Sequence, residues 1–361
     1  MVSYPEVVRI DITGECNLRC LHCQASMFLG QAERDLTTSE WKSFLRQFAD
    51  EGGLYVTFLG GEPFLRRDLV ELIEFGRALG LRSAVTTHGL LLTSELIRRC
   101  FELGCVLSLS IDGPDAESHD YFRGRGTFAK ICRILRKIED VRGSGIAGTL
   151  GLSATINSKS HRKVTDLFNF AKSASADFLT IAQIHGGGRA AVNWQQISIS
   201  EADLRRAATD VLSEMLALQQ QSHPLLVRPD FITHRLKDEV EREIGTQVTF
   251  PAKLDFSGIT EFYVQHDGNV FPSQQVSNML PDVRQGAERI GITFSGNNIR
   301  QATLREIFAS RPFERFRELM MSRAYIDEYH ACKTCVHKYV DCIPGIGRYF
   351  EGIDSPHVFC Q

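Results

Sequence analysis

The first half of the chain alternates short runs of β-forming residues with amphipathic stretches, and this alternation constrains the fold more than any other feature. Strands in such a pattern are joined by crossover helices, so they lie parallel in one sheet covered by helices. We expect strands at Val7–Ile12, Leu54–Leu59, Arg82–Thr87, Cys105–Ile111, Thr149–Ile156 and Phe178–Ile184. We expect helices at Ser39–Asp50, Leu69–Leu79, Ser94–Leu103, Phe128–Val141 and His161–Ser173. Six such units predict an α/β fold, an open, partial (β/α)6 TIM-like barrel with its functional residues at the carboxyl ends of the strands.

The pattern changes after residue 190. A long helix is expected over Glu201–Gln221 and a helical connector over Arg228–Gly245. β character returns at Ile259–Gln265 and Val270–Phe271, with an Asp-Gly hairpin signal between them, and a helical stretch follows at Leu304–Met321. We therefore divide the chain into a barrel (1–190), a helical connector (191–254) and a small C-terminal α+β iron–sulfur domain (255–361).

Charge and hydropathy argue against two classes of partner. The chain has 41 Lys plus Arg and 44 Asp plus Glu, a net charge of −3, so bulk charge does not favour nucleic acid. No apolar stretch approaches the roughly 20 residues that cross a bilayer, and the N-terminus does not resemble a signal peptide. We expect a cytoplasmic protein that binds neither nucleic acid nor membrane. Ten cysteines in such a chain indicate metal or redox chemistry rather than disulfides.

Three of these cysteines, Cys16, Cys20 and Cys23, follow the first expected strand directly. Three thiolates are one too few for a closed structural zinc site. They suit an iron–sulfur cubane in which one iron has no protein ligand and can bind a substrate or cofactor. Zinc completed by His22 or by a distant residue is the alternative.

The spacing C-x3-C-x2-C after a first strand resembles the hallmark of the radical S-adenosylmethionine (radical SAM) superfamily, and the resemblance covers residues 7–190. It continues in the turn that begins at Gly60, which in the family contacts the methionine amino group of the cofactor. Ser110 and Asp112 stand where the family places residues that contact the ribose of the cofactor. Arg123 resembles an arginine that the family often uses to bind the methionine carboxylate. The cofactor-binding residues implied in this way are Gly60, Gly61, Glu62, Ser110, Asp112 and Arg123. One departure is His88, which stands where relatives often carry Asn. We expect it to cap its turn, with a position facing the substrate as the alternative.

The resemblance implies an enzyme that uses a 4Fe-4S cluster and S-adenosylmethionine. Reductive cleavage of S-adenosylmethionine gives a 5′-deoxyadenosyl radical, which abstracts hydrogen from a substrate carbon while the protein orients the reactants. The resemblance also implies an external electron donor of the flavodoxin or ferredoxin type.

A second cysteine group lies near the C-terminus. Cys332, Cys335, Cys342 and Cys360 could form a four-thiolate zinc ribbon. Behind a radical SAM core they resemble the SPASM or twitch extension, which carries auxiliary iron–sulfur clusters. The extension's hairpin normally ends in a cysteine, and this chain has Ser273 there. Ile346 replaces another ligand of the same cluster, so the resemblance implies one auxiliary cluster and two 4Fe-4S clusters in all.

The remaining cysteines, Cys100, Cys105 and Cys132, are expected as small buried apolar residues, with a hydrogen-atom donor as the alternative. Gln274 and Gln275 stand where some relatives that oxidise a peptidyl residue place a carboxylate base. An amide does not accept a proton at neutral pH, which disfavours that reaction here.

The family resemblance favours a ribosomally made peptide as substrate, matured by cross-linking or another carbon-centred modification. The first strand begins almost at once, so we expect leader recognition to need a separate protein or the middle segment. Two alternatives remain open. One is oxidation, epimerisation or decarboxylation of a sugar or other small molecule, and the other is a noncatalytic metal-binding module.

Overall fold

A single sheet organises the part of the chain that the computed structural model describes, namely residues 4–250, 253–254, 258–277, 286–289, 291–294, 296–338 and 342–343. Its nine strands lie in the order β10-β9-β1-β2-β3-β4-β5-β6-β7. Every neighbouring pair runs parallel except β9 and β10, which form an antiparallel hairpin. The strands are β1 (Val7–Asp11), β2 (Tyr55–Leu59), β3 (Arg82–Thr87), β4 (Val106–Ser110), β5 (Leu150–Ile156), β6 (Phe178–Gln183), β7 (Leu226–Pro229), β9 (Glu261–Val264) and β10 (Val270–Phe271). Strands β8 (Lys253–Leu254) and β11 (Cys342–Ile343) pair separately.

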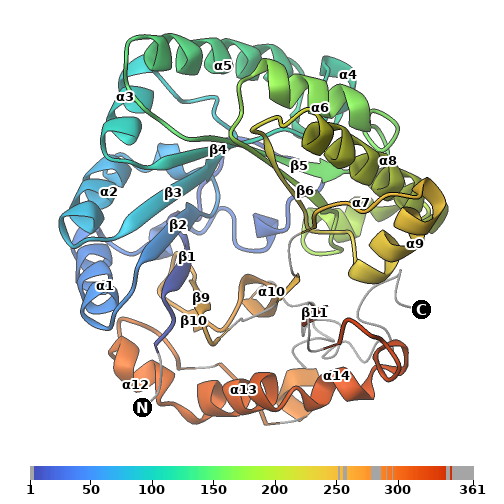
Figure 1. Ribbon diagram of the computed structural model, residues 1–361. Coiled ribbons are helices and arrows are strands. Elements are labelled where there is room, and N and C mark those ends of the chain that lie inside the picture. The colour runs from blue at the N-terminus through green and yellow to red at the C-terminus, as the bar shows by residue number, and fades with distance from the viewer. Residues whose placement is uncertain are drawn as a thin grey trace.

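Helices surround the curved sheet on its outer side, as Figure 1 shows. None of the described helices is long and apolar enough to cross a membrane. The helices are α1 (Thr38–Asp50), α2 (Leu69–Ala78), α3 (Ser94–Glu102), α4 (Ala116–Arg123), α5 (Thr127–Gly143), α6 (Val164–Ser173), α7 (Arg189–Ile197), α8 (Glu201–Gln220), α9 (His234–Ile244), α10 (Gln274–Ser277), α12 (Leu304–Phe308), α13 (Arg311–Ser322) and α14 (Ala324–Glu328).

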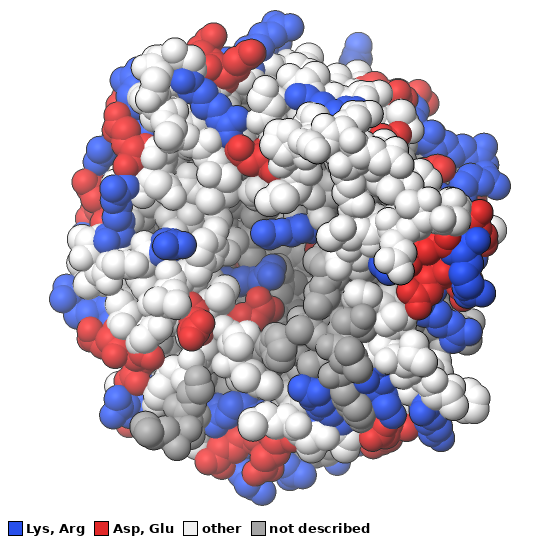
Figure 2. Space-filling model, viewed as in Figure 1, with Lys and Arg blue, Asp and Glu red and all other residues white. Residues whose placement is uncertain are grey.

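The two faces of the sheet differ in chemistry because successive side chains point to opposite sides. The outer face is apolar and packs against the helices, as Ile10 and Phe58 do beside Trp41 of α1. The inner face carries small hydroxyl side chains in register on neighbouring strands. These residues are Thr57, Thr86, Ser108, Ser110, Ser153, Thr155 and Thr180. Figure 2 shows the molecule hollowed where the strands surround its centre.

The first-half elements expected from the sequence are present, each within a few residues of its expected bounds. The hairpin signal is confirmed as well, since Gly268 turns with φ +90° between β9 and β10. The sequence pattern missed α4 and α7.

Two expectations from the second half are wrong. The segment Arg228–Gly245 is not one helical connector, because its start belongs to β7, which extends the parallel sheet beyond six strands, and only His234–Ile244 is helical. The stretch Leu304–Met321 is two helices rather than one. Pro312 has no amide hydrogen, so it is accommodated in the first turn of a new helix, α13, and not inside a longer one.

Candidate functional site: the cysteine loop

The three N-terminal cysteines lie on the loop that joins β1 to α1, and we call residues 12–30 the cysteine loop. All three are free thiols; Cys20 is buried and the other two are half-buried. The amide of Gly30 donates to the carbonyl of Gly14 at 2.9 Å, which closes the loop on itself. The carboxyl end of the first parallel strand therefore carries Cys16, Cys20 and Cys23 together, as expected from the sequence.

Burial raises the pKa of each of these thiols, to about 11 for Cys16. Charge on Cys20 or Cys23 raises the pKa of Cys16 further, so the three lie within electrostatic range of one another. Among the described residues no three His, Cys, Asp or Glu side chains are grouped closely enough to hold one metal ion.

A turn after β2 holds the backbone of the cysteine loop. Gly60 has φ +113°, and a Cβ on Gly61 would lie 1.8 Å from the carbonyl oxygen of Glu15, so both positions require glycine. The amide of Gly61 donates to the carbonyl of Thr13 at 3.0 Å, and that of Glu62 to the carbonyl of Glu15 at 2.7 Å. The glycines thus allow two backbones to approach closely at the carboxyl ends of β1 and β2.

The carboxylate of Glu62 is buried at the centre of this contact. It accepts hydrogen bonds from Thr87 Oγ1 at 2.5 Å, from the amide of His88 at 3.0 Å and from the amide of Phe64 at 3.1 Å. Burial raises the pKa of Glu62, and these hydrogen bonds oppose that effect. The bonds fix the orientation of the carboxylate at the end of the inner face.

The expectation that His88 caps its turn is confirmed. Its Nδ1 accepts from the amide of Leu90 at 3.0 Å. Its Nε2 lies 2.7 Å from Asn17 Oδ1 on the cysteine loop and 3.2 Å from Glu62 Oε2. The same ring therefore also connects the end of β3 to the cysteine loop.

A buried ion pair lies beside Cys20. Arg123 Nε, at the end of α4, donates to Asp112 Oδ2 at 2.5 Å, and His22 Nε2 lies 3.4 Å from the same oxygen. Burial alone would raise the pKa of Asp112, but Arg123 and His22 hold it at about 2. Asp112 Oδ1 and His22 Nδ1 are buried and have no hydrogen-bond partner among the described residues. Ser110, half-buried, ends β4 on the inner face just before this pair.

Sequence reasoning missed Arg189, which closes the other side of the cysteine loop. Its amide donates to the carbonyl of Cys23 at 3.1 Å and its Nε to the carbonyl of Cys20 at 3.0 Å, while its Nη2 is buried without a partner among the described residues. Gly188 has φ +55°, and a Cβ there would lie 2.7 Å from the carbonyl of Cys23. The signal was available as the triple glycine from Gly186 to Gly188, which is separated from the end of β6 by two residues.

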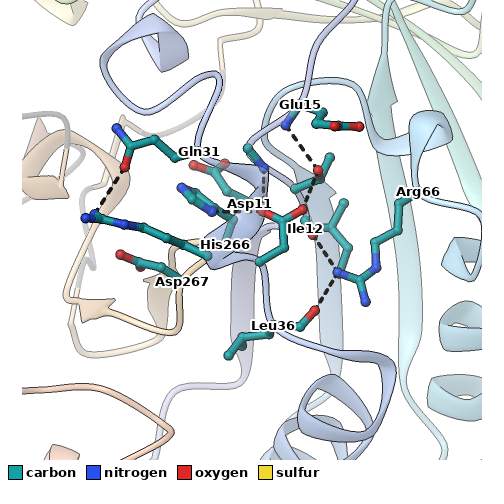
Figure 3. Close-up of polar contacts among 12 residues, drawn as sticks. Asp11, Ile12, Glu15, Gln31, Leu36, Arg66, His266 and Asp267 are labelled. Atoms are coloured by element: carbon teal, nitrogen blue, oxygen red, sulfur yellow. Dashed lines mark hydrogen bonds and ion pairs between the residues drawn. The ribbon is translucent and has the colours of Figure 1, made fainter.

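A further polar network, drawn in Figure 3, joins the cysteine loop to the β9–β10 hairpin. Asp35 accepts from Thr13 Oγ1 at 2.6 Å and from the amide of Gly14 at 2.8 Å, and its Oδ1 lies 2.9 Å from His266 Nδ1. Nearby, the hydroxyl of Tyr263 donates to Asp11. Segments more than 200 residues apart in the sequence therefore fix the start of the cysteine loop.

The C-terminal cysteines are described only in part. Cys332 is buried in an apolar cluster with Tyr325 and Tyr329, and the amide of Cys335 donates to the carbonyl of Cys332 at 3.3 Å. Cys342 lies in β11, but its side chain and the whole of Cys360 lie outside the described residues. The ligand role expected for this group stays a prediction.

The scattered cysteines are apolar core residues, as expected. Cys100 and Cys105 are fully buried in the main hydrophobic core, and Cys132 packs against it. Ser273, which stands where the SPASM pattern has a cysteine, is buried and accepts from the amide of Val276 at 3.3 Å.

Comparison with known proteins places this site in context. Residues 10–160 match the radical SAM superfamily. The AdoMet-dependent heme synthase of Methanosarcina barkeri is 34% identical over 178 residues, which cover 49% of this chain and 50% of that protein. The PqqA peptide cyclase of Rhizobium meliloti is 28% identical over 320 residues, covering 81% of this chain and 82% of the cyclase. The chain spans about half the length of the first curated relatives that it matches.

Solved structures share the fold. SuiB of Streptococcus suis bound to S-adenosylmethionine superposes with a TM-score of 0.70 at 18% identity, covering 99% of this chain and 78% of SuiB. The protein anSMEcpe, bound to AdoMet and a Cp18Cys peptide, gives a TM-score of 0.68 at 18% identity, covering 92% of this chain and 86% of anSMEcpe.

Proposed function

The chain belongs to the radical SAM superfamily, and we propose that it is an enzyme that holds a 4Fe-4S cluster on Cys16, Cys20 and Cys23. The observation that carries the proposal is the convergence on the cysteine loop of three free thiols, the Glu62 turn and three buried polar atoms that have no hydrogen-bond partner in the described part of the chain. Those atoms are His22 Nδ1, Asp112 Oδ1 and Arg189 Nη2. Unpartnered buried polar atoms are costly, so such a cluster favours a polar ligand.

The bound cluster and S-adenosylmethionine would together supply a 5′-deoxyadenosyl radical that abstracts hydrogen from the substrate. The residues of the chain would bind and orient the cofactor. Glu62 would accept the methionine ammonium, and Gly60 and Gly61 would let the backbone approach it. Ser110 and Asp112 would contact the ribose, while Arg123 would offer the guanidinium nitrogens not used by Asp112 to the methionine carboxylate.

The proposed substrate is a ribosomally made peptide. Support comes from the similarity to PqqA peptide cyclase along most of the chain and from the shared fold with SuiB bound to its precursor peptide. The hydroxyl side chains on the inner face suit hydrogen bonds to a polar chain such as a peptide. A separate leader-binding protein and an external one-electron donor would complete the system.

A second candidate substrate is a heme precursor. Relatives named AdoMet-dependent heme synthase and Fe-coproporphyrin III synthase are 34% and 31% identical over their matched parts, a higher identity than that of the peptide cyclases. The match to those proteins covers only about half of each. A sugar or another small molecule is a further alternative substrate.

In the C-terminal part, Cys332, Cys335, Cys342 and Cys360 would hold one auxiliary 4Fe-4S cluster. Four thiolates leave no open iron, so this cluster would serve electron transfer or structure rather than substrate binding. A zinc ribbon is the competing assignment.

The test is anaerobic reconstitution with iron and sulfide, followed by dithionite and S-adenosylmethionine. We expect 5′-deoxyadenosine and methionine in equal amounts, and a protein that makes neither contradicts the proposal. Incubation with short peptides encoded beside the gene, and separately with iron coproporphyrin III, then assigns the substrate by the change in mass. Modification of the porphyrin alone would overturn the peptide assignment.

A further inference from the structure

We infer that the surface beside the cysteine loop is the docking site of an acidic one-electron carrier protein. The inference rests on the proposed function, because only a redox group at the cysteine loop makes electron delivery there useful. At this surface the carrier would lose one electron to the group held by the loop, with no bond or proton change.

The surface is formed by four segments that hydrogen bonds hold together. The amide of Leu21 donates to the carbonyl of Phe122 at 2.9 Å, and Asn193 Nδ2 donates to the carbonyl of Leu21 at 3.0 Å. The amide of Ser158 donates to the carbonyl of Ile197 at 3.1 Å. We call the exposed part of residues 17–27, 121–126, 158–159 and 189–197 the loop-side patch.

The loop-side patch is positively charged. Its four segments contain no Asp or Glu and five Arg or Lys residues, of which Arg123 and Arg189 are not exposed, although the whole chain has a net charge of −3. Arg19, Arg125 and Lys159 are exposed, and none has a carboxylate partner among the described residues. Lys159 Nζ instead lies 4.9 Å from the ring centre of Tyr121. Free cations at a rim favour and accelerate docking of an acidic partner.

Exposed apolar side chains concentrate on the same segments. Eight large apolar side chains are exposed among the described residues, and four of them belong to the loop-side patch. These four are Met27 (45% exposed), Tyr121 (38%), Val192 (85%) and Trp194 (42%). Aromatic and methionine side chains are enriched at protein interfaces.

The position of the loop-side patch in the molecule indicates which kind of protein docks there. One segment of the patch, residues 17–27, contains Cys20 and Cys23 themselves, and electron transfer becomes steeply slower with distance. A carrier docked here would contact the segment that carries two of the three thiolates. The substrate could then occupy that hollow while the carrier is bound.

The test compares Arg125→Glu/Lys159→Glu with the control Arg133→Glu/Arg136→Glu, which makes the same charge change on the exposed side of α5. The probe is flavodoxin, an acidic one-electron carrier protein. For the patch variant we expect its Kd, measured by calorimetry without S-adenosylmethionine, to rise about tenfold. The rate at which reduced flavodoxin bleaches the cluster absorbance should fall similarly at low flavodoxin concentration. Dithionite-driven formation of 5′-deoxyadenosine should be unchanged, and the control should behave as the wild type.

Unchanged flavodoxin binding and reduction in the patch variant would overturn the inference. So would a raised KM for the peptide in the dithionite-driven reaction, because that result would assign the surface to the substrate. A wild-type protein that forms no 5′-deoxyadenosine with dithionite is a different outcome, which contradicts the proposed function itself.

Discussion

The two cysteine groups of this chain are held in different ways. The N-terminal group lies on a loop fixed by the turns after β2 and β3, by Arg189 and by the β9–β10 hairpin. In the C-terminal group, as far as the structure describes it, Cys332 is packed among side chains of nearby helices and Cys335 follows it in a local turn. Just after Cys335, His337 lies 2.7 Å from Asp238 of α9, so this group has a long-range contact as well. Long-range fixation of a reactive loop is typical of a site whose geometry must be exact to within a fraction of an ångström. The first group differs in having the buried carboxylate of Glu62 and the ion pair of Asp112 and Arg123 beside it, and this difference predicts catalysis at the first group and support at the second.

Removing the N-terminal thiols should have the largest effect. In the triple variant Cys16→Ala/Cys20→Ala/Cys23→Ala, formation of 5′-deoxyadenosine should fall below detection, because the cluster loses its protein ligands. Chromatography of the reaction mixture measures the product after reconstitution with iron and sulfide. Cys132→Ala, which alters a thiol outside both groups, is the matched control and should keep wild-type activity. If the triple variant cleaves S-adenosylmethionine at the wild-type rate, the assignment of catalysis to the N-terminal cysteine group is wrong.

Removing the C-terminal thiols should have a different effect. Two cubanes require about eight irons per chain, and Cys332→Ala/Cys335→Ala/Cys342→Ala should lower the count to about four. Cleavage of S-adenosylmethionine should persist, while turnover of the substrate should fall. Iron and sulfide analysis with electron paramagnetic resonance measures the count. A wild-type value near twelve would show a further cluster with a noncysteine ligand, and a value near four with bound zinc would favour the ribbon.

The sequence predicted the barrel because its signals are local. Apolar periodicity marked β1 to β6 and their helices, and parallel topology placed Cys16, Gly60 and Asp112 at one end of the sheet. The polar network of His266 and Asp35 could not be predicted, because it joins residues 231 positions apart and depends on β9 pairing with β1. Strand β7 was missed because it has only four residues, ends in a proline and leaves Leu226 and Arg228 exposed.

Glu62 tests whether the turn that holds the N-terminal cysteine loop also binds the cofactor. Glu62→Ala should weaken S-adenosylmethionine binding about tenfold to a hundredfold, the equivalent of about 1.5–3 kcal/mol for a charge-assisted hydrogen bond. Equilibrium dialysis of the reconstituted protein measures the Kd. Thr87→Val removes the hydroxyl that donates to Glu62 but keeps the carboxylate, so it should change the Kd far less. Equal losses in both variants would make Glu62 a structural residue only.

Asp112 makes the fixation of the N-terminal site dependent on pH. Its pKa is about 2 in the folded chain, below the ordinary 3.8, so the charged form stabilises the fold above about pH 4. That contribution, about 2 kcal/mol, is lost as the pH falls from about 4 to about 2. Asp112→Asn should therefore be less stable than wild type at neutral pH, and the difference should shrink across this range. Urea unfolding before cluster assembly measures it, and a constant difference would contradict the buried ion pair.

The smallest expected effect tests the contact between the two regions. His266 belongs to the β9–β10 hairpin, yet its ring reaches Asp35, which holds Thr13 and Gly14 at the start of the cysteine loop. His266→Ala should slow formation of 5′-deoxyadenosine a few-fold with an unchanged iron count, because Asp35 keeps its other two hydrogen bonds. His266→Gln, whose amide can donate to Asp35, should recover part of the rate, and His223→Ala in the connector should leave it unchanged. A loss of iron in His266→Ala would show that the hairpin is required to assemble the first site, and the two regions would then form one functional unit.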